Sequence, residues 1–427
     1  MADNGPALPH GDIWVRLADR RDGRLAFKLS FSPDIGKYFN TDTFFIEYDE
    51  DIRNVDESIL YIPVIANVAP VSWATGARIH VKELDETFIG SLRIIRNNIK
   101  SLFPGFSCAG DVDVEYAVSN RFCHKGAAQL FTGGVDSLAT YARHRDEKPA
   151  LIALEIFKPY NRPLQGIINR ELYAFAGKEG VNFHRVRSNL NYAFFNQKRL
   201  LADYGQCLFE ASWWASIQHG LGLLGMCAPL TTVLDIQKIY IASSATKSVP
   251  QGVGRPWGSH PYIDGNVAWA DVKAVHDGLE WSRQEKIRHA IKPYIDGTGE
   301  YPKIIVCDET LRGDVLNCGR CEKCCRTIVG LALEGIDPNR CGFDVNAGTF
   351  DRIRQKLLWD RLMFAYNKSG MWKDIQSAIP DTIKGDLYGS KAFFEWLRTQ
   401  EFPGKWDKYK PLSQRLLQKC LKLGIIQ

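Results

Sequence analysis

The chain has 427 residues, of which 45% are hydrophobic and 24% charged, and its formal net charge is +5. These values are typical of a globular protein of two or three domains and exclude a disordered or fibrous chain. The small positive charge suits anionic small-molecule ligands or a local basic patch and is too weak to argue for nucleic-acid binding. Residues 1–12 are polar and acidic, unlike a signal or transit peptide, so we expect a cytoplasmic protein.

Residues 1–105 predict an N-terminal α+β domain. Residues 83–105 carry an apolar helical face that ends at Pro104 and Gly105. Nothing in this part indicates catalysis, so we expect it to dock a partner or shape the substrate site. Before residue 83, three segments alternate apolar and polar residues, as half-buried antiparallel strands do: 12–18, 24–32 and 43–50.

Residues 121–345 predict an α/β fold with a Rossmann-like parallel sheet and helices on both faces. Apolar, β-rich runs alternate with helical segments, and this alternation is typical of parallel sheets. In such sheets ligands bind beyond the carboxyl ends of the strands. The expected strands are residues 126–131, 150–157, 182–188 and 238–244.

The stretch from Ser212 to Leu234 has the length of a membrane span, and His219 is its sole acidic or basic side chain. Gln218, Pro229 and several glycines interrupt it, and no second such stretch exists. We therefore favour a helix buried against a sheet over a membrane span. For His219 we favour a core histidine with satisfied hydrogen bonds over a catalyst.

Residues 346–427 predict a basic helical C-terminal region. A solvated helical cap is favoured over a tRNA-binding face because dispersed charges usually face solvent. Three segments carry an apolar helical face: 351–367, 390–400 and 413–425.

The stretch FTGGVDS, Phe131–Ser137, follows the first expected strand of the parallel sheet. It holds no lysine and is therefore not a Walker A loop. Its two glycines let the backbone approach a ligand, and the following amides, with the helix N-terminus near Asp136, form a nest for an anion. Hydroxyls at either end add donors, and Asp136 is expected to cap the helix or hold Mg²⁺. A glycine pair at such a turn also occurs without a ligand, so these residues alone leave both interpretations open.

FTGGVDS resembles the S-G-G-x-D-S signature of the PP-loop, or N-type ATP pyrophosphatase, superfamily, with Thr132 where serine is common. The resemblance implies a HUP-type fold and attack of a substrate oxygen on the α-phosphorus of ATP, giving an adenylated intermediate and pyrophosphate. It places adenosine at the end of the second strand, near Leu154, Glu155 and Ile156. The residues that it assigns to the pyrophosphate portion of ATP are Phe131, Thr132, Gly133, Gly134, Val135, Asp136 and Ser137.

A second motif is formed by cysteines, five of which lie between Cys307 and Cys325. This local crowding indicates a metal site in a reducing compartment rather than a disulfide framework. Cys325 is a spare thiol that we expect to point to the core. The spacing predicts a closed four-thiolate Zn²⁺ site, with an iron–sulfur cluster left open, and its ligands are Cys307, Cys318, Cys321 and Cys324.

This motif resembles the C-terminal zinc motif, C…CGxCxxC, of the 7-cyano-7-deazaguanine synthases within the superfamily. The match is close in the last three ligands, and the first gap of ten residues is slightly longer than usual. Together the two motifs cover about residues 121–345 and leave the N-terminal domain and the helical tail outside the resemblance.

Several cations between the two motifs are candidates to stabilise charge on the α-phosphate. Lys247 and Arg255 follow the fourth expected strand, and Arg283 and Lys286 lie three apart on an expected helix, where a surface salt-bridge ladder is the alternative. We expect residues 257–264 and 275–287 to close over the nucleotide as a loop. The predicted catalytic residues are Asp136, Ser137, Lys247, Arg255 and Lys286.

These features predict an ATP-dependent enzyme that adenylates a carboxylate or carbonyl oxygen, with ATP, Mg²⁺ and Zn²⁺ as cofactors. The 7-cyano-7-deazaguanine synthases, which the two motifs resemble, convert a 7-deazaguanine carboxylate to the nitrile with ammonia. Conjugation of such a carboxylate to a protein or peptide is left open. The alternatives are an amino-acid or peptide-carboxylate activator such as the muramyl-peptide glutamate epimerase, a tRNA thiolase, and a non-catalytic nucleotide-binding scaffold. The expected partners are ATP and a carboxylate-bearing small molecule; tRNA and membranes are not expected, and a homodimer is left open.

Overall fold

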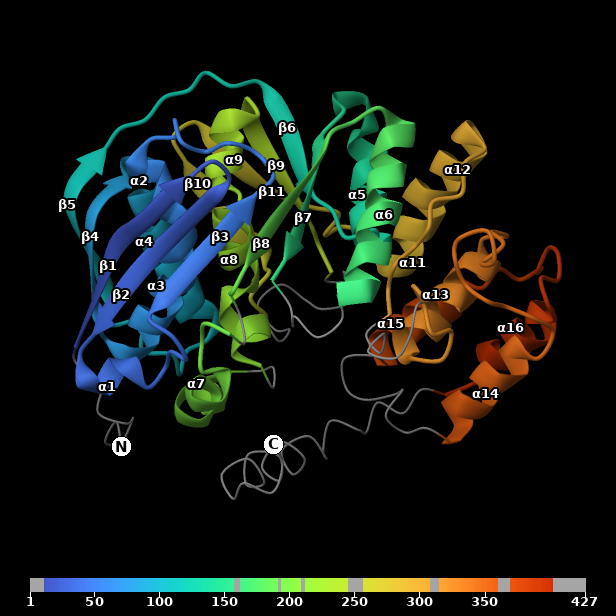
Figure 1. Ribbon diagram of the computed structural model, residues 1–427. Helices are drawn as coiled ribbons and strands as arrows, with labels where there is room; N and C mark the ends of the chain where they lie inside the picture. The colour runs from blue at the N-terminus through green and yellow to red at the C-terminus, as the bar shows by residue number, and fades with distance from the viewer. Residues whose placement is uncertain are drawn as a thin grey trace.

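The computed structural model describes residues 11–156, 162–190, 193–208, 212–244, 256–307, 315–359 and 369–401. Within them an eleven-stranded sheet runs through the molecule in the order β10-β11-β9-β6-β7-β8-β3-β2-β1-β4-β5 (Figure 1). The strands are β1 Asp12–Arg21, β2 Arg24–Phe31, β3 Thr43–Tyr48, β4 Arg78–Asp85, β5 Asp111–Val118, β6 Gly126–Leu130, β7 Ala150–Glu155, β8 Phe183–Ser188, β9 Ile236–Ala242, β10 Ala268–Trp269 and β11 Val272–Asp277.

The α/β class and the parallel sheet are confirmed. Strands β8, β7, β6, β9 and β11 pair in parallel, and numbered along the chain from β6 they lie in the order 3-2-1-4-5. This is the order of doubly wound sheets, whose switch point lies between the first and fourth strands, here β6 and β9. One expectation is wrong: residues 275–277 are not part of a loop but complete β11. Val272 and Ala274 alternate into the core and hold this segment in the sheet.

The N-terminal residues extend the same sheet rather than building a second one. β3 pairs antiparallel with β8, with Tyr48 opposite Val186, and β1, β2 and β3 form the predicted antiparallel set. β4 and β5, which the sequence analysis did not predict, run parallel to β1 and end the sheet. The residues predicted as a separate domain up to residue 105 therefore share their sheet with the parallel strands, and the domain boundary stays a prediction.

Helices cover both faces of the parallel strands, as predicted. Alternate residues of β7 belong to two different hydrophobic cores: Ile152 packs in the core with α3 and α8, whereas Leu151 and Ala153 pack in the core with α5 and α13. Figure 1 shows α5 and α6 on one side of these strands and α8 and α9 on the other. The helices are α1 Pro33–Gly36, α2 Glu57–Leu60, α3 Ile62–Thr75, α4 Glu86–Leu102, α5 Val135–His144, α6 Arg162–Glu179, α7 Gln197–Tyr204, α8 His219–Gly225, α9 Ala228–Val233, α10 Pro261–Asp264, α11 Arg283–Lys286, α12 Lys292–Thr298, α13 Glu322–Leu333, α14 Thr349–Trp359, α15 Ser369–Ser377 and α16 Ser390–Arg398.

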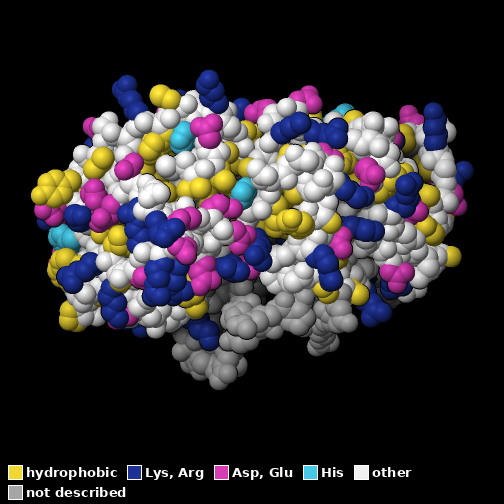
Figure 2. All heavy atoms as spheres, turned by 45° about the horizontal axis from the view of Figure 1, so that its top comes forward, with side chains coloured by type: hydrophobic (Ala, Val, Ile, Leu, Met, Phe, Trp, Pro, Cys, Tyr) yellow, Lys and Arg dark blue, Asp and Glu magenta, His cyan; other side chains and the backbone are white. Residues whose placement is uncertain are grey.

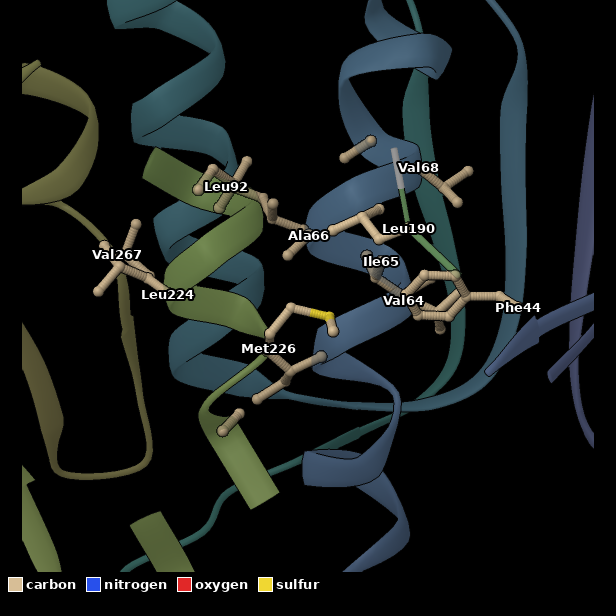
Figure 3. Close-up of a cluster of buried hydrophobic side chains, with 14 of the residues drawn as sticks. Phe44, Val64, Ile65, Ala66, Val68, Leu92, Leu190, Leu224, Met226 and Val267 are labelled. Carbon is tan, nitrogen blue, oxygen red and sulfur yellow. The ribbon is translucent and has the colours of Figure 1, made fainter. Parts of the chain in front are cut away.

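The apolar stretch from Ser212 to Leu234 forms helices inside the hydrophobic core that contains α3. A π-helical turn at Trp214–Gln218 leads into α8, and α9 follows it. α8 lies against the fully buried α3 (Figure 3), so close that a Cβ on Gly225 would lie 2.3 Å from Cβ of Ala66. The buried-helix prediction is confirmed, and among the described helices none has both the length and the apolar character needed to cross a bilayer.

The C-terminal helices pack on the hydrophobic core that contains α5 and α13. The predicted helix 390–400 appears as α16, and the described part of the predicted helix 351–367 appears as α14; residues 360–367 lie outside the described residues. Phe350, Phe393 and Leu397 anchor both helices in that core. α15 was not predicted, and the third predicted helix, 413–425, lies outside the described residues. Figure 2 shows Lys and Arg side chains interspersed with Asp and Glu on the face that it presents.

Candidate functional site

The Thr132–Ser137 loop joins the carboxyl end of β6 to α5, beside the switch point of the sheet. α5 begins at Val135, next to Asp136, as predicted. Gly133 has a φ of 71°, a left-handed conformation that favours glycine. The first N–H groups of α5 have no partner inside the helix and point toward the loop side, which makes this end attractive for an anion.

The Ser137 hydroxyl holds the loop together from inside. It donates to the Gly134 carbonyl oxygen at 3.1 Å, lies 3.3 Å from the Thr132 hydroxyl and accepts from the Thr132 N–H at 3.4 Å. The Ser137 side chain is buried. Its primary contribution in this arrangement is therefore to shape the loop, and donation to a phosphate would require it to leave Gly134.

The Asp136 carboxylate lies against two cations from α11. It forms an ion pair with Arg283, and Nζ of Lys286 lies 3.1 Å from Oδ1. Burial alone would raise the pKa of Asp136, but Arg283 and Lys286 outweigh it and lower the pKa to about 2. The prediction that Asp136 caps α5 is wrong: Gly134 occupies the N-cap position, and the side chain is drawn to α11 instead.

Lys286 connects three elements at this point. Its side chain is only 2% exposed, and Nζ donates both to Asp136 and to the carbonyl oxygen of Ser243, which follows β9. A capping box at Ser282 starts α11 and fixes the direction of its side chains. The two cations face one carboxylate, so the cluster keeps a surplus of positive charge beside the loop. This burial excludes a surface salt-bridge ladder for Lys286.

Other predicted site residues lie at the carboxyl edge of the parallel strands, like the loop, or outside the described residues. Leu154, Glu155 and Ile156 lie at the carboxyl end of β7, next to β6, and Glu155 accepts a hydrogen bond from Asn169 at 2.7 Å. Lys247 and Arg255 lie outside the described residues. The Mg²⁺ site expected at Asp136 does not fit this arrangement, because both cations already neutralise the carboxylate.

The shape of the loop gives a first prediction. A Cβ on Gly133 would lie 2.9 Å from Leu172 and 3.1 Å from Ile305, in a backbone conformation that costs about 1–3 kcal/mol for other residues. Gly133→Ala is therefore expected to lower both the melting temperature and ATP affinity, measured by calorimetry. Gly166→Ala is the matched control, since its Cβ would meet nothing within 4 Å. Unchanged ATP affinity in Gly133→Ala would argue against this loop as the binding site.

The four predicted cysteines meet at the start of α13. All four sulfurs lie within 4.8 Å of one another, with 3.9 Å between Cys307 and Cys321 and 4.0 Å between Cys318 and Cys324. A tetrahedral Zn²⁺ site with Zn–S bonds of about 2.3 Å needs sulfurs about 3.8 Å apart. These thiols therefore fit Zn²⁺ and can hold a metal ion. Cys325 is buried and points away, toward the carbonyl oxygen of Arg320.

The segment that carries Cys307 also supports the loop. The apolar run of residues 302–309 predicts a strand, but its described part, residues 302–307, is not one. These residues are held instead by single hydrogen bonds to several partners. The Ile305 N–H donates to the Gly133 carbonyl oxygen at 2.8 Å, and Asn317 binds the backbone on both sides of Ile305, at Ile304 and Val306. The first metal ligand is thus two residues from a direct contact with the loop.

A buried charge network that was not predicted from the sequence lies behind these contacts. Arg326, on α13 two residues after Cys324, forms an ion pair with Glu322 at 3.3 Å and adds to the positive field that lowers the pKa of Asp136. Trp372 of α15 donates to the same Glu322 at 3.1 Å. The available signal was a charged pair four residues apart, Glu322 and Arg326, at the end of the cysteine motif.

His219 departs from its prediction in one respect. Burial lowers its pKa to about 4, as suits a core histidine, and Trp214 and Trp257 pack against its ring. Its Nδ1, however, is buried and has no hydrogen-bond partner among the described residues. The expectation of a satisfied histidine is therefore wrong for this atom.

A scan against protein-family models finds no match, and neither a search of curated proteins nor a search of solved structures finds one. Functional assignment consequently depends on the motifs and the geometry of the loop, its cations and the four cysteines.

Proposed function

We propose that the chain binds ATP at the Thr132–Ser137 loop and adenylates a carboxylate or carbonyl oxygen with release of pyrophosphate. The observation that carries this proposal is the lysine-free glycine pair at the switch point of a doubly wound sheet, with Lys286 and Arg283 directed at the same turn. Ligands of such sheets bind at this point, beyond the carboxyl ends of the strands.

The chemistry suits transfer of AMP. The amides that start α5 offer donors for a pyrophosphate group that leaves intact, and Arg283 and Lys286 offset the charge that develops as it departs. Both cations are prepositioned by Asp136, so little reorganisation is needed when the phosphates bind. Mg²⁺, when bound with ATP, would supply further charge neutralisation on the phosphates.

The acceptor follows from the resemblance. The PP-loop motif combined with a downstream four-cysteine site favours a 7-deazaguanine-type carboxylate that becomes an amide or nitrile, or is joined to a protein or peptide. The Zn²⁺ site would be structural, since four thiolates leave no open coordination position. Four reduced thiols and the absence of disulfides among the described cysteines suit a reducing compartment such as the cytoplasm.

Product analysis tests the proposal. The purified protein is incubated with ATP, Mg²⁺ and a panel of carboxylates, with and without ammonium chloride, and nucleotides and pyrophosphate are quantified. The expected result is AMP and pyrophosphate in equal amounts with at least one carboxylate. Formation of ADP without AMP, or no turnover across the panel while ATP binds, would contradict an adenylating enzyme; the second outcome would favour the scaffold alternative.

A further inference from the structure

The last two residues of β11 point to opposite faces of the sheet. Asp277 faces α5, where its carboxylate accepts from the Thr140 hydroxyl at 2.8 Å and lies 3.0 Å from Nε2 of His144. His276 faces the other way, to the core that contains Val272 and Ala274 of the same strand. His276 thus lies at the carboxyl edge of the sheet, on the face opposite α5.

Asp264 fixes the tautomer of His276. Nδ1 of His276 lies 2.8 Å from Oδ2 of Asp264, and the Ser259 hydroxyl donates to the same oxygen at 2.6 Å. Asp264 is fully buried, and its other oxygen packs against Gly220, where a Cβ would lie only 1.6 Å away. Because Oδ2 is the acceptor for the Ser259 hydroxyl, we assign it as the acceptor for His276 as well, so Nδ1 carries the ring proton and Nε2 presents a lone pair.

Nε2 has no hydrogen-bond partner among the residues that the structure describes. The His276 side chain is only 3% exposed, so bulk water does not satisfy this atom either. An unmet buried acceptor is unfavourable, so it marks a place where a ligand or water belongs. The π-helical turn Trp214–Gln218 leads into the α8 residues beside Asp264, and such turns are frequent at functional sites.

His276 lies near the proposed ATP site. β11 neighbours β9, which neighbours β6, and adjacent strands are about 4.8 Å apart, so the ends of β11 and β6 are about 10 Å apart along the same edge. The Ser243 N–H donates to the Asp277 carbonyl oxygen at 2.8 Å, and the Ser243 carbonyl oxygen accepts from Lys286. The His276 side chain is only 3% exposed, so a substrate that spans this edge must displace the groups that cover it to reach both the loop and Nε2.

We infer that Nε2 of His276 is the general base that takes a proton from an N–H nucleophile, ammonia or a primary amine. This inference rests on the proposed function. The amine nitrogen attacks the adenylated carboxyl carbon; a C–N bond forms, the C–O bond to AMP breaks, AMP leaves, and the amine proton passes to Nε2. Asp264 is the positioning residue: it orients the ring and stabilises the imidazolium that results.

The test measures amide formation with the carboxylate that supports pyrophosphate release, using ammonium chloride, methylamine or hydroxylamine as nucleophile. His276→Gln is expected to slow amide formation with ammonia or methylamine by about 10²–10⁴-fold, the usual contribution of general base catalysis. Hydroxylamine, a more reactive and less basic nucleophile, should restore most of the rate. Asp264→Asn should show the same pattern, because an amide donor facing Nδ1 places the proton on Nε2.

His80→Gln is the control, since His80 is also paired with carboxylates, Asp12 at 2.7 Å and Asp113 at 3.1 Å, but lies on the N-terminal strands. It should retain the wild-type rate with every nucleophile. Wild-type amide formation in a folded His276→Gln protein would overturn this inference alone, as would equal losses with all three nucleophiles, which indicate a structural role. No pyrophosphate release by the wild-type protein would overturn the proposed function as well.

Discussion

Asp136→Asn is expected to slow AMP formation from ATP by about 10²–10³-fold, the usual loss when a preorganised charge at a reacting centre is removed. The substitution leaves Arg283 and Lys286 facing each other without the carboxylate that holds both. Arg283 is then free to turn away from the loop, whereas Lys286 keeps its hydrogen bond to the Ser243 carbonyl oxygen. The measurement is the rate of AMP and pyrophosphate release at saturating ATP.

The same substitution changes how stability depends on pH. The pKa of Asp136 in the folded protein, about 2, lies below its ordinary value of 3.8, so the ionised carboxylate stabilises the fold above about pH 4. That contribution, on the order of 2 kcal/mol, is lost as the pH falls from 4 toward 2. Urea unfolding across this range should show a smaller loss of stability in Asp136→Asn than in the wild-type protein.

Asp146→Asn provides the control, since Asp146 is an exposed aspartate two residues after the end of α5, the helix that carries Asp136. It should leave turnover and the acid profile unchanged. Wild-type AMP formation in Asp136→Asn would contradict the role given to this carboxylate and its two cations.

Removal of the metal is expected to have the largest effect on the fold. Zinc binding by four thiolates contributes about 10–16 kcal/mol in small zinc-binding peptides, so chelation or Cys307→Ser should unfold the region around α13. Because Ile305 binds Gly133 two residues before Cys307, ATP affinity should fall along with stability. Elemental analysis should find one Zn²⁺ per chain before chelation and much less in Cys307→Ser.

Cys123→Ser controls for loss of a thiol, since Cys123 is exposed and remote in sequence from the four ligands. It should keep its Zn²⁺, its melting temperature and its ATP affinity. If chelation removes Zn²⁺ while ATP affinity stays at the wild-type value, the link from the cysteine site to the loop is absent.

The sequence by itself determined the features that depend on neighbouring residues. Period-two alternation identified β1, β2 and β3, and apolar runs identified β6 to β9, since side-chain direction repeats within each strand. The glycine pair fixed the turn after β6, and the spacing of three cysteines around Gly319 fixed most of the metal site. In each case the determining contacts lie within a few residues of one another.

The tertiary structure alone decided which distant groups meet. Arg283 lies 147 residues from Asp136 in the chain, and Asp264 meets His276 across different elements. β5 was not predicted although its residues alternate polar and apolar side chains, whereas β11 carries a weaker pattern and gains its strand identity from pairing with β9. A sheet brings its strand ends together in an order that local preferences do not encode, because each pairing depends on packing across the whole core. The sequence named Arg283 and Lys286 as candidate cations, but their pairing with Asp136 became visible only once β6, β9 and α11 were placed in space.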